Sequence, residues 1–218
     1  MRKTQTKKSK VNKGNFIAFE GIDGSGKSTQ IALLAERLKK EGVYCYTTME
    51  PTDSPIGSLI HQIMVGRIKT DNRVIAGLFV ADRLDHLLNE VNGIVPKIDE
   101  GMTVITDRYY FSSYAYHSVD MPMEWVIKAN EQSSNLLRPT ITIFIDVDPD
   151  VAIERIAKNR FHQELFEKKS RLVKVRENYL KAFELLEKEE KYVIINGNQS
   201  PEEIAEDIWA AVKGFFNV

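Results

Sequence analysis

The stretch that most constrains this chain is residues 16–29, which read FIAFEGIDGSGKST. An apolar segment rich in β-forming residues ends at Glu20, a loop with three glycines follows, and from Lys27 the apolar residues recur at helical spacing. Residues 21–28 match the phosphate-binding loop (P-loop) pattern, in which two glycines five apart precede Lys and then Ser or Thr. The order strand, loop, helix therefore predicts a nucleotide-binding α/β domain.

Each part of this loop has a predicted task. Glycines let backbone N–H groups turn toward a phosphate, and the helix N-terminus adds partial positive charge. Lys27 is predicted to reach the outer phosphates, and the Ser28 hydroxyl to bind Mg²⁺. The alternative is a glycine-rich turn that caps a helix and binds nothing. The predicted ATP-binding residues are Gly21, Ile22, Asp23, Gly24, Ser25, Gly26, Lys27, Ser28 and Thr29.

Composition sets the outer limits. The 218 residues are 43% hydrophobic and 28% charged, which is typical of one globular domain. No run approaches the ~18 apolar residues of a membrane span, and no signal peptide is recognisable, so we expect a cytoplasmic protein with no membrane partner. The single cysteine, Cys45, cannot form an internal disulfide and is expected in the core rather than as a nucleophile.

The basic charge gathers at the N-terminus. Residues 1–14 contain six Lys and Arg and no acid, which leaves a net charge of −7 on the remainder. Such a tail could touch nucleic acid or an anionic surface, but short basic termini are usually solvated and disordered. We therefore expect a tail at 1–14, no nucleic-acid partner, and a single P-loop domain at 15–218.

Two later segments are predicted to lie near the loop. Glu50-Pro51 follows a predicted strand at 43–48, and Asp107-Arg108-Tyr109 follows another at 102–106. Ligands of open α/β sheets bind at the carboxyl ends of strands, where Arg108 could clamp a phosphate and Asp107 could face a metal-bound water. The alternatives are a plain strand-to-helix connection and a surface ion pair.

A helix is predicted over 73–92, with Val74, Leu78, Ala81, Leu84, Leu88 and Val91 as its apolar face. Within it, Phe79 and Arg83 are four apart and share a face, so an aromatic plane beside a guanidinium could hold a nucleobase. An ordinary packing pair explains the same spacing. With four histidines and no metal-ligand spacing, the sequence predicts no metal site built on His.

The combination of the P-loop with Glu50-Pro51, Phe79, Asp82-Arg83 and Asp107-Arg108-Tyr109 resembles the thymidylate kinases of the nucleoside monophosphate kinase group. The resemblance extends from about residue 15 to the C-terminus. It implies an enzyme, a homodimer, that transfers the γ-phosphoryl group of ATP to dTMP with Mg²⁺, supplying dTTP synthesis.

The resemblance also implies roles for individual residues. Phe79 would stack on thymine, Arg83 would bond the base edge, and Tyr116 would lie under the deoxyribose. Arg108 would hold the acceptor phosphate, with Asp107 beside Mg²⁺ and Asp23 at the metal or sugar side. The implied metal residues are Ser28, Asp23 and Asp107, and the implied substrate-binding residues are Glu50, Pro51, Phe79, Arg83, Arg108, Ser113 and Tyr116.

The sequence departs from the family pattern at four places. Met49 stands where many members have Arg, His117 where many have Gln, and Ser113 where some have Asn. The P-loop also lacks the arginine that some members carry, so the resemblance implies that a mobile lid near 158–169 supplies the missing cation. The predicted catalytic residues of this lid are Arg155, Lys158 and Arg160. The alternative is that these residues form a solvated basic surface.

Together these features predict a doubly wound, mostly parallel five-stranded sheet flanked by helices, with the P-loop after the first strand and further strands at 140–146 and 191–196. No guanine-reading Asn-Lys-x-Asp segment is present, which argues against a GTPase switch. A P-loop regulatory module without turnover, and a kinase for another nucleotide or a nucleoside, remain as alternatives.

Overall fold

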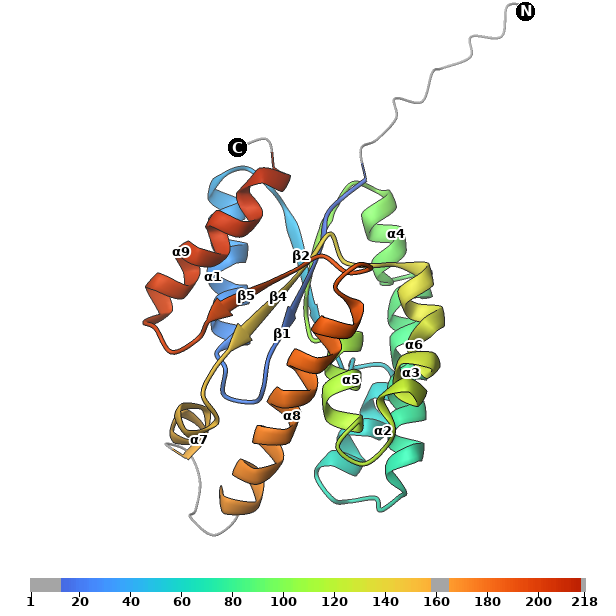
Figure 1. The fold of residues 1–218 in the computed structure, drawn as a ribbon. Helices are drawn as coiled ribbons and strands as arrows, with labels where there is room; N and C mark the ends of the chain where they lie inside the picture. The colour runs from blue at the N-terminus through green and yellow to red at the C-terminus, as the bar shows by residue number, and fades with distance from the viewer. Residues whose placement is uncertain (1–12, 158–164, 217–218) are drawn as a thin grey trace, which may run out of the picture.

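The computed structural model describes residues 13–157 and 165–216, and their five strands form one sheet in the order β2-β3-β1-β4-β5 (Figure 1). Every neighbouring pair is parallel. The predicted doubly wound sheet is confirmed, and it is parallel throughout because each crossover between the described strands contains helix. The strands are β1 Phe16–Glu20, β2 Cys45–Met49, β3 Thr103–Asp107, β4 Ile141–Asp146 and β5 Tyr192–Asn196, all within two residues of their predicted positions.

Strand β1 lies in the middle of the sheet, and all five of its residues are buried. A parallel strand covered on both faces needs an almost uninterrupted apolar sequence, which explains the run FIAF. Phe19 lies opposite Asp107 on β3 and Ile143 on β4. The loop that follows β1 therefore emerges at the centre of the sheet's carboxyl edge.

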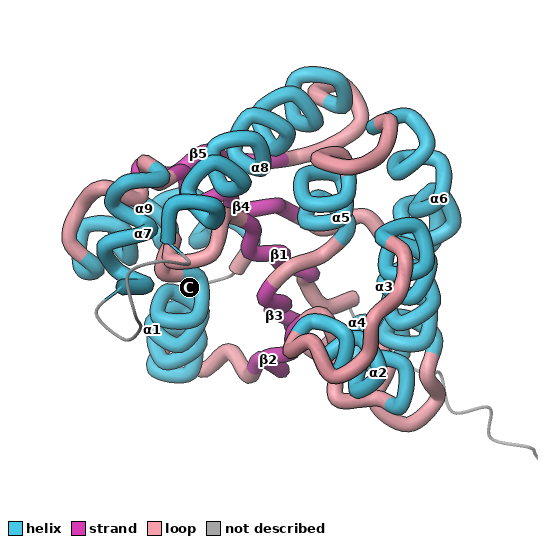
Figure 2. Tube along the Cα trace, turned by 90° about the horizontal axis from the view of Figure 1, so that it is seen from below, coloured by secondary structure: helices cyan, strands magenta, loops and turns pink. Residues whose placement is uncertain are grey.

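Helices cover both faces of the sheet (Figure 2). Helices α1 and α9 lie on one face, while α4, α5 and α8 lie on the other with α3 and α6 beside them. The helices are α1 Lys27–Lys40, α2 Pro55–Met64, α3 Asn72–Leu88, α4 Ile94–Asp99, α5 Tyr110–His117, α6 Met123–Leu136, α7 Pro149–Ala157, α8 Leu165–Leu186 and α9 Pro201–Val212. In the part of the chain that the structure describes, no helix has the length and apolarity needed to cross a bilayer.

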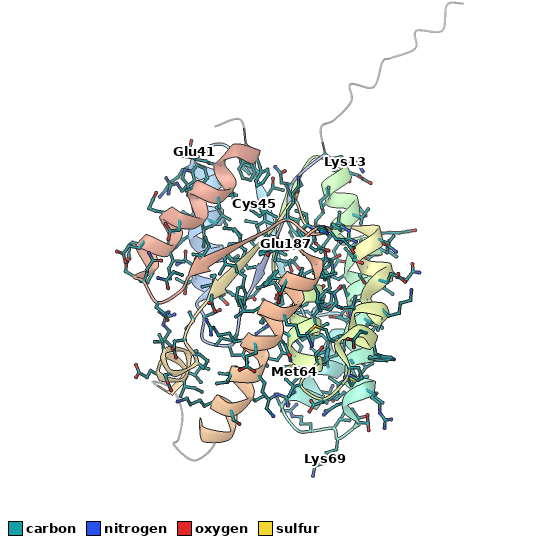
Figure 3. The ribbon with its side chains drawn as sticks, in the orientation of Figure 1. Lys13, Glu41, Cys45, Met64, Lys69 and Glu187 are labelled. Atoms are coloured by element: carbon teal, nitrogen blue, oxygen red, sulfur yellow. The ribbon has the colours of Figure 1, made fainter. Side chains whose placement is uncertain are left out.

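Side chains fill the space between the sheet and its helices (Figure 3). Cys45 is half-buried on β2 and packs against this core, and burial raises the pKa of its thiol. A thiol of raised pKa is a poor nucleophile, in agreement with the expectation that Cys45 is a packing residue.

Helix α3 differs from its prediction in both length and orientation. It ends at Leu88 rather than near residue 92, and the apolar stripe that was expected to face the core is largely exposed. Val74 is 49% exposed, Leu88 51% and Val91, beyond the helix, 91%.

The buried residues of α3 are Ala76, Asp82, Arg83, His86 and Leu87. Polar side chains turn inward here because each finds buried partners: the Asp82 carboxylate accepts hydrogen bonds from the backbone N–H and hydroxyl of Thr52 and from the hydroxyl of Ser54.

Parts of two predicted segments are described. Of the basic tail, Lys13 and Gly14 are placed, and the Gly14 N–H donates to the carbonyl of Ile98 at 2.9 Å. Of the predicted lid, residues 158–164 lie outside the described residues, and Lys169 belongs to α8.

Candidate active site

The loop between β1 and α1 has the conformation that its glycines permit. Gly24 has φ +81°, and a Cβ added there would lie 2.6 Å from the carbonyl oxygen of Ala152 on α7. Both its backbone angle and its packing therefore require glycine. Gly26, with φ +96°, is the N-cap of α1, so the first amides of that helix face the loop, as an anion site requires.

Lys27 points into the loop. Its Nζ donates to the carbonyl oxygens of Gly21 at 3.0 Å and Ile22 at 3.3 Å, and the residue is 6% exposed. Burial, and then the charge of Arg108, lower the pKa of Lys27 to about 8. Burial therefore destabilises the charged form of Lys27, and an anion bound in the loop would stabilise it.

Ser28 and Asp107 meet at the adjacent ends of α1 and β3. The Ser28 hydroxyl donates to Asp107 Oδ2 at 3.0 Å. The other carboxylate oxygen, Oδ1, is buried and has no hydrogen-bond partner among the described residues. An orphaned buried carboxylate oxygen beside a hydroxyl suits a hard cation or its bound water. Asp23, the third predicted metal residue, is not in this pair.

Arg108 follows β3 in a left-handed conformation, with φ +73°. Its Nη2 donates to Asp23 Oδ1 at 2.5 Å and to the Tyr116 hydroxyl at 3.2 Å. Its Nη1 lies 3.4 Å from the Gly21 carbonyl oxygen, which also accepts from Lys27. Lys27 and Arg108 therefore both contact one oxygen. This oxygen lies where the P-loop meets a cavity that Arg108, Phe79 and Arg83 line.

Arg83 anchors the opposite end of this cavity, where its side chain is 1% exposed. Its Nε donates to Glu50 Oε2 at 2.8 Å, and its Nη1 donates to the Ser113 hydroxyl at 3.1 Å and to Asn130 Oδ1. Its Nη2 contacts Glu50 again and donates to the carbonyl of Tyr109. Each of the three guanidinium nitrogens thus donates at least one hydrogen bond, which fixes the plane of the group.

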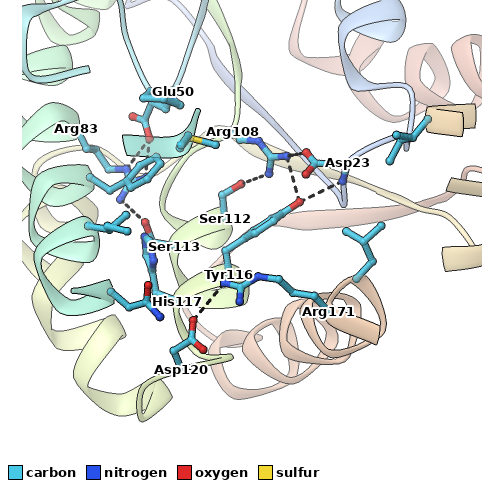
Figure 4. Close-up of a pocket in the computed structure, with 17 residues that line it drawn as sticks. Asp23, Glu50, Arg83, Arg108, Ser112, Ser113, Tyr116, His117, Asp120 and Arg171 are labelled. Carbon is cyan, nitrogen blue, oxygen red and sulfur yellow. Dashed lines mark hydrogen bonds and ion pairs between the residues drawn. The ribbon is translucent and has the colours of Figure 1, made fainter. Parts of the chain in front are cut away.

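The cavity has a volume of about 650 Å³ (Figure 4). Its lining is mainly apolar, with polar groups at the Arg108 and Arg83 ends, as in sites for small organic ligands. It brings together every residue predicted to bind substrate, namely Glu50, Pro51, Phe79, Arg83, Arg108, Ser113 and Tyr116, together with Asp23.

Further residues of the cavity were not predicted to bind substrate. The ring of His117 lies 5.2 Å from that of Phe79, and burial, followed by the charges of Arg83 and Arg171, lowers the pKa of His117 to about 4. At the mouth, Arg171 on α8 donates to Asp120 at 3.2 Å (Figure 4). Their separation of 51 residues left no local signal in the sequence.

Arg155 lies away from the two converging cations. Its Nη2 donates to the carbonyl of Gly197 at 2.9 Å, in the loop between β5 and α9. The other predicted lid cations, Lys158 and Arg160, lie outside the described residues. Of the three, the structure therefore places only Arg155.

Comparison with known proteins gives consistent matches. The family model described as "Thymidylate kinase" matches residues 19–208. The probable thymidylate kinase of Pyrobaculum aerophilum is 41% identical over 199 residues, which cover 91% of this chain and 96% of the relative. Those of Pyrococcus horikoshii and Methanococcoides burtonii are each 39% identical over 208 residues, covering 92% of this chain and 97% and 96% of the relatives.

Proposed function

The chain belongs to the thymidylate kinase family, whose reaction is the phosphorylation of dTMP to dTDP, and we propose that it binds dTMP in the cavity between Arg108 and Arg83. In this arrangement the phosphate lies at Arg108, the deoxyribose against Tyr116, and thymine against Phe79. Ser113, beside the Arg83 guanidinium, faces the base. Arg108 at one end, and at the other end an Arg83 guanidinium whose charge is paired with Glu50, support this orientation.

The convergence of Lys27 and Arg108 on the Gly21 carbonyl carries the proposal. ATP in the P-loop places its outer phosphates at Lys27, and dTMP places its phosphate at Arg108, so the two anions meet where two cations already converge. Phosphoryl transfer has a loose transition state, and catalysis consists mainly of positioning and charge neutralisation. No nucleophilic side chain is needed, because the dTMP phosphate oxygen attacks the γ-phosphorus directly while the bond from that phosphorus to the β–γ bridging oxygen breaks and ADP leaves.

Mg²⁺ is the proposed cofactor. Ser28 and Asp107 fit it, since a hydroxyl lies beside a carboxylate whose second oxygen is buried and unpartnered among the described residues. When bound, the ion neutralises charge on the ATP phosphates. Asp23 lies nearer the acceptor, where it orients Arg108.

A third cation is proposed to come from the lid. The P-loop cannot carry an arginine at position 24, because any side chain there would collide with Ala152. Arg155, Lys158 and Arg160 are the proposed sources, and closure of this segment would also exclude water from the transferred group.

A homodimer is proposed through the outer face of α3. Val74, Ala81 and Leu88 are exposed and lie on one side of this helix, and exposed Met64 and Val65 belong to the neighbouring end of α2. An apolar helix face exposed to water is a typical subunit contact.

A substrate panel tests the function. We expect ADP formation with dTMP and, more weakly, with dUMP, because one methyl group in an apolar pocket contributes about 1–3 kcal/mol. AMP, GMP and thymidine should be poor acceptors, since purines exceed the space beside Phe79 and thymidine lacks the phosphate for Arg108. Preference for a purine monophosphate would refute the proposed cavity, and absence of ADP with every acceptor would indicate a P-loop module without turnover.

A further inference from the structure

Glu20, the last residue of β1, is a buried carboxylate with four hydrogen bonds. Its Oε1 accepts from the backbone N–H groups of Tyr109 at 2.8 Å and Ser112 at 3.1 Å. Its Oε2 accepts from the hydroxyls of Ser112 at 2.6 Å and Tyr179 at 2.9 Å. Glu20 is 0% exposed and does not line the cavity, so substrate cannot reach it.

The same two hydroxyls lie against Arg108. Arg108 Nη1 donates to Ser112 Oγ at 2.9 Å and lies 3.5 Å from the Tyr179 hydroxyl, and the two hydroxyl oxygens are 2.8 Å apart. A pair of hydroxyls therefore separates a buried anion from the guanidinium. Three elements meet in this cluster: β1 through Glu20, α5 through Ser112, and α8 through Tyr179.

The orientation of the Arg108 side chain depends on contacts that substrate does not displace. Its backbone is left-handed, a conformation that costs a non-glycine residue on the order of 1 kcal/mol or more. Of its side-chain partners, Asp23 is 60% exposed and Tyr116 lines the cavity, so both face the incoming nucleotide. Ser112 is 8% exposed in the cavity wall and Tyr179 is fully buried, so both contacts lie on the inner side of the guanidinium and can persist when substrate binds.

We propose that Glu20 and Tyr179 are positioning residues, which act through Ser112 and Arg108 to aim the guanidinium at the acceptor phosphate. The inference rests on the proposed role of Arg108. It also gives α8 a function beyond packing, because this helix carries Arg171 at the cavity mouth and Tyr179 behind Arg108. Eight residues of helix separate the two, a distance of about 12 Å.

The chain contains a matched control for this cluster. Tyr110 is also a fully buried tyrosine, and its hydroxyl donates to Glu190, a buried carboxylate, at 2.8 Å. Neither residue lines the cavity or contacts Arg108. Tyr110→Phe therefore reports the general cost of breaking a buried phenol–carboxylate bond, and Glu190→Gln reports that cost together with loss of the charged partner of Arg138.

The experiment compares Tyr179→Phe and Glu20→Gln with these controls in steady-state assays of the full chain. We expect each to lower kcat/KM for dTMP by tenfold or more, with KM for ATP within twofold, because a misdirected catalytic group can cost about a hundredfold. Tyr110→Phe and Glu190→Gln should remain within twofold of the parent. Ser112→Ala, which keeps the backbone N–H to Glu20, replaces any variant that fails to fold.

A double-mutant cycle with Arg108→Ala separates positioning from packing. If Tyr179 acts through Arg108, Tyr179→Phe should cost less than twofold in the Arg108→Ala background, measured by single-turnover assay. An equal tenfold cost in both backgrounds, or parent-like activity of Tyr179→Phe, overturns the inference. A parent that does not phosphorylate dTMP would instead refute the proposed function, and an unimpaired Arg108→Ala would refute the role of Arg108.

Discussion

At the scale of single residues, the site is arranged around two cations that share one acceptor. Lys27 and Arg108 both contact the Gly21 carbonyl, and Arg108 contributes, after burial, to the lowered pKa of Lys27. Like charges this close together favour the binding of an anion between them. Burial, and then the charge of Arg108, thus bring the pKa of the P-loop lysine to about 8.

This arrangement predicts pH-dependent ATP binding. With a pKa of about 8, Lys27 loses its proton as the pH rises, so the free protein loses the cation that attracts the outer phosphates. We expect the Kd for ATP to rise about tenfold between about pH 7 and about pH 9, measured by calorimetry. Lys27→Met should bind ATP weakly and without this dependence. A parent Kd that stays constant across the same range would contradict the lowered pKa.

At the scale of elements, α7 lies between the P-loop and the segment that is proposed as a lid. Its Ala152 carbonyl packs against Gly24, and its Arg155 reaches Gly197 near the end of β5. These two contacts hold α7 beside the P-loop and the end of β5. Lys169 of α8 pairs with Asp150 of α7, which connects these two helices.

The placement of Arg155 sharpens the expectation for the lid. Because its guanidinium already donates to the Gly197 carbonyl, Arg155 is the weakest of the three proposed sources, and Arg155→Ala should lower turnover less than tenfold. Lys158→Ala or Arg160→Ala should instead lower turnover more than tenfold with ATP affinity nearly unchanged, since a cation at the transferred group acts chiefly in the transition state. Near-normal turnover in all three variants, measured under saturating substrates, would rule out a catalytic cation from this segment.

At the scale of the whole molecule, the exposed face of α3 has no partner among the described residues. The face predicted from apolar periodicity is the outer one, and the inner one is occupied by Asp82, Arg83 and His86. Apolar residues of such regular spacing at the surface are the basis for the proposed dimer. The proposed dimer would then place α3, which carries Phe79 and Arg83, at the subunit contact.

Sedimentation tests this assembly. Val74→Asp combined with Leu88→Asp should convert a dimer into a monomer, because two carboxylates would be buried in an apolar contact. Tyr44→Asp is the control, since Tyr44 is 80% exposed and precedes β2, outside α2 and α3. A parent that sediments as a monomer, or a double variant that remains dimeric, would refute the α3 contact.

Much of the architecture follows from local sequence. The P-loop, the buried β1 and the positions of the five strands along the chain were predictable because glycine spacing and apolar runs are signals within a few residues. The substrate-binding residues were predicted from the family resemblance, and the tertiary structure gathers all of them around one cavity. These features depend on chemistry that each segment carries by itself.

Only the tertiary structure decided how the polar residues are used. Periodicity assigned the wrong face of α3 to the core, because Asp82 is buried by partners on the Thr52 loop rather than by its own hydrophobicity. Glu20 and Tyr179 are 159 residues apart, and nothing in either segment indicates their contact. Burial of a polar group is favourable only where its hydrogen bonds are completed, and the partners that complete them come from elements that meet only after folding.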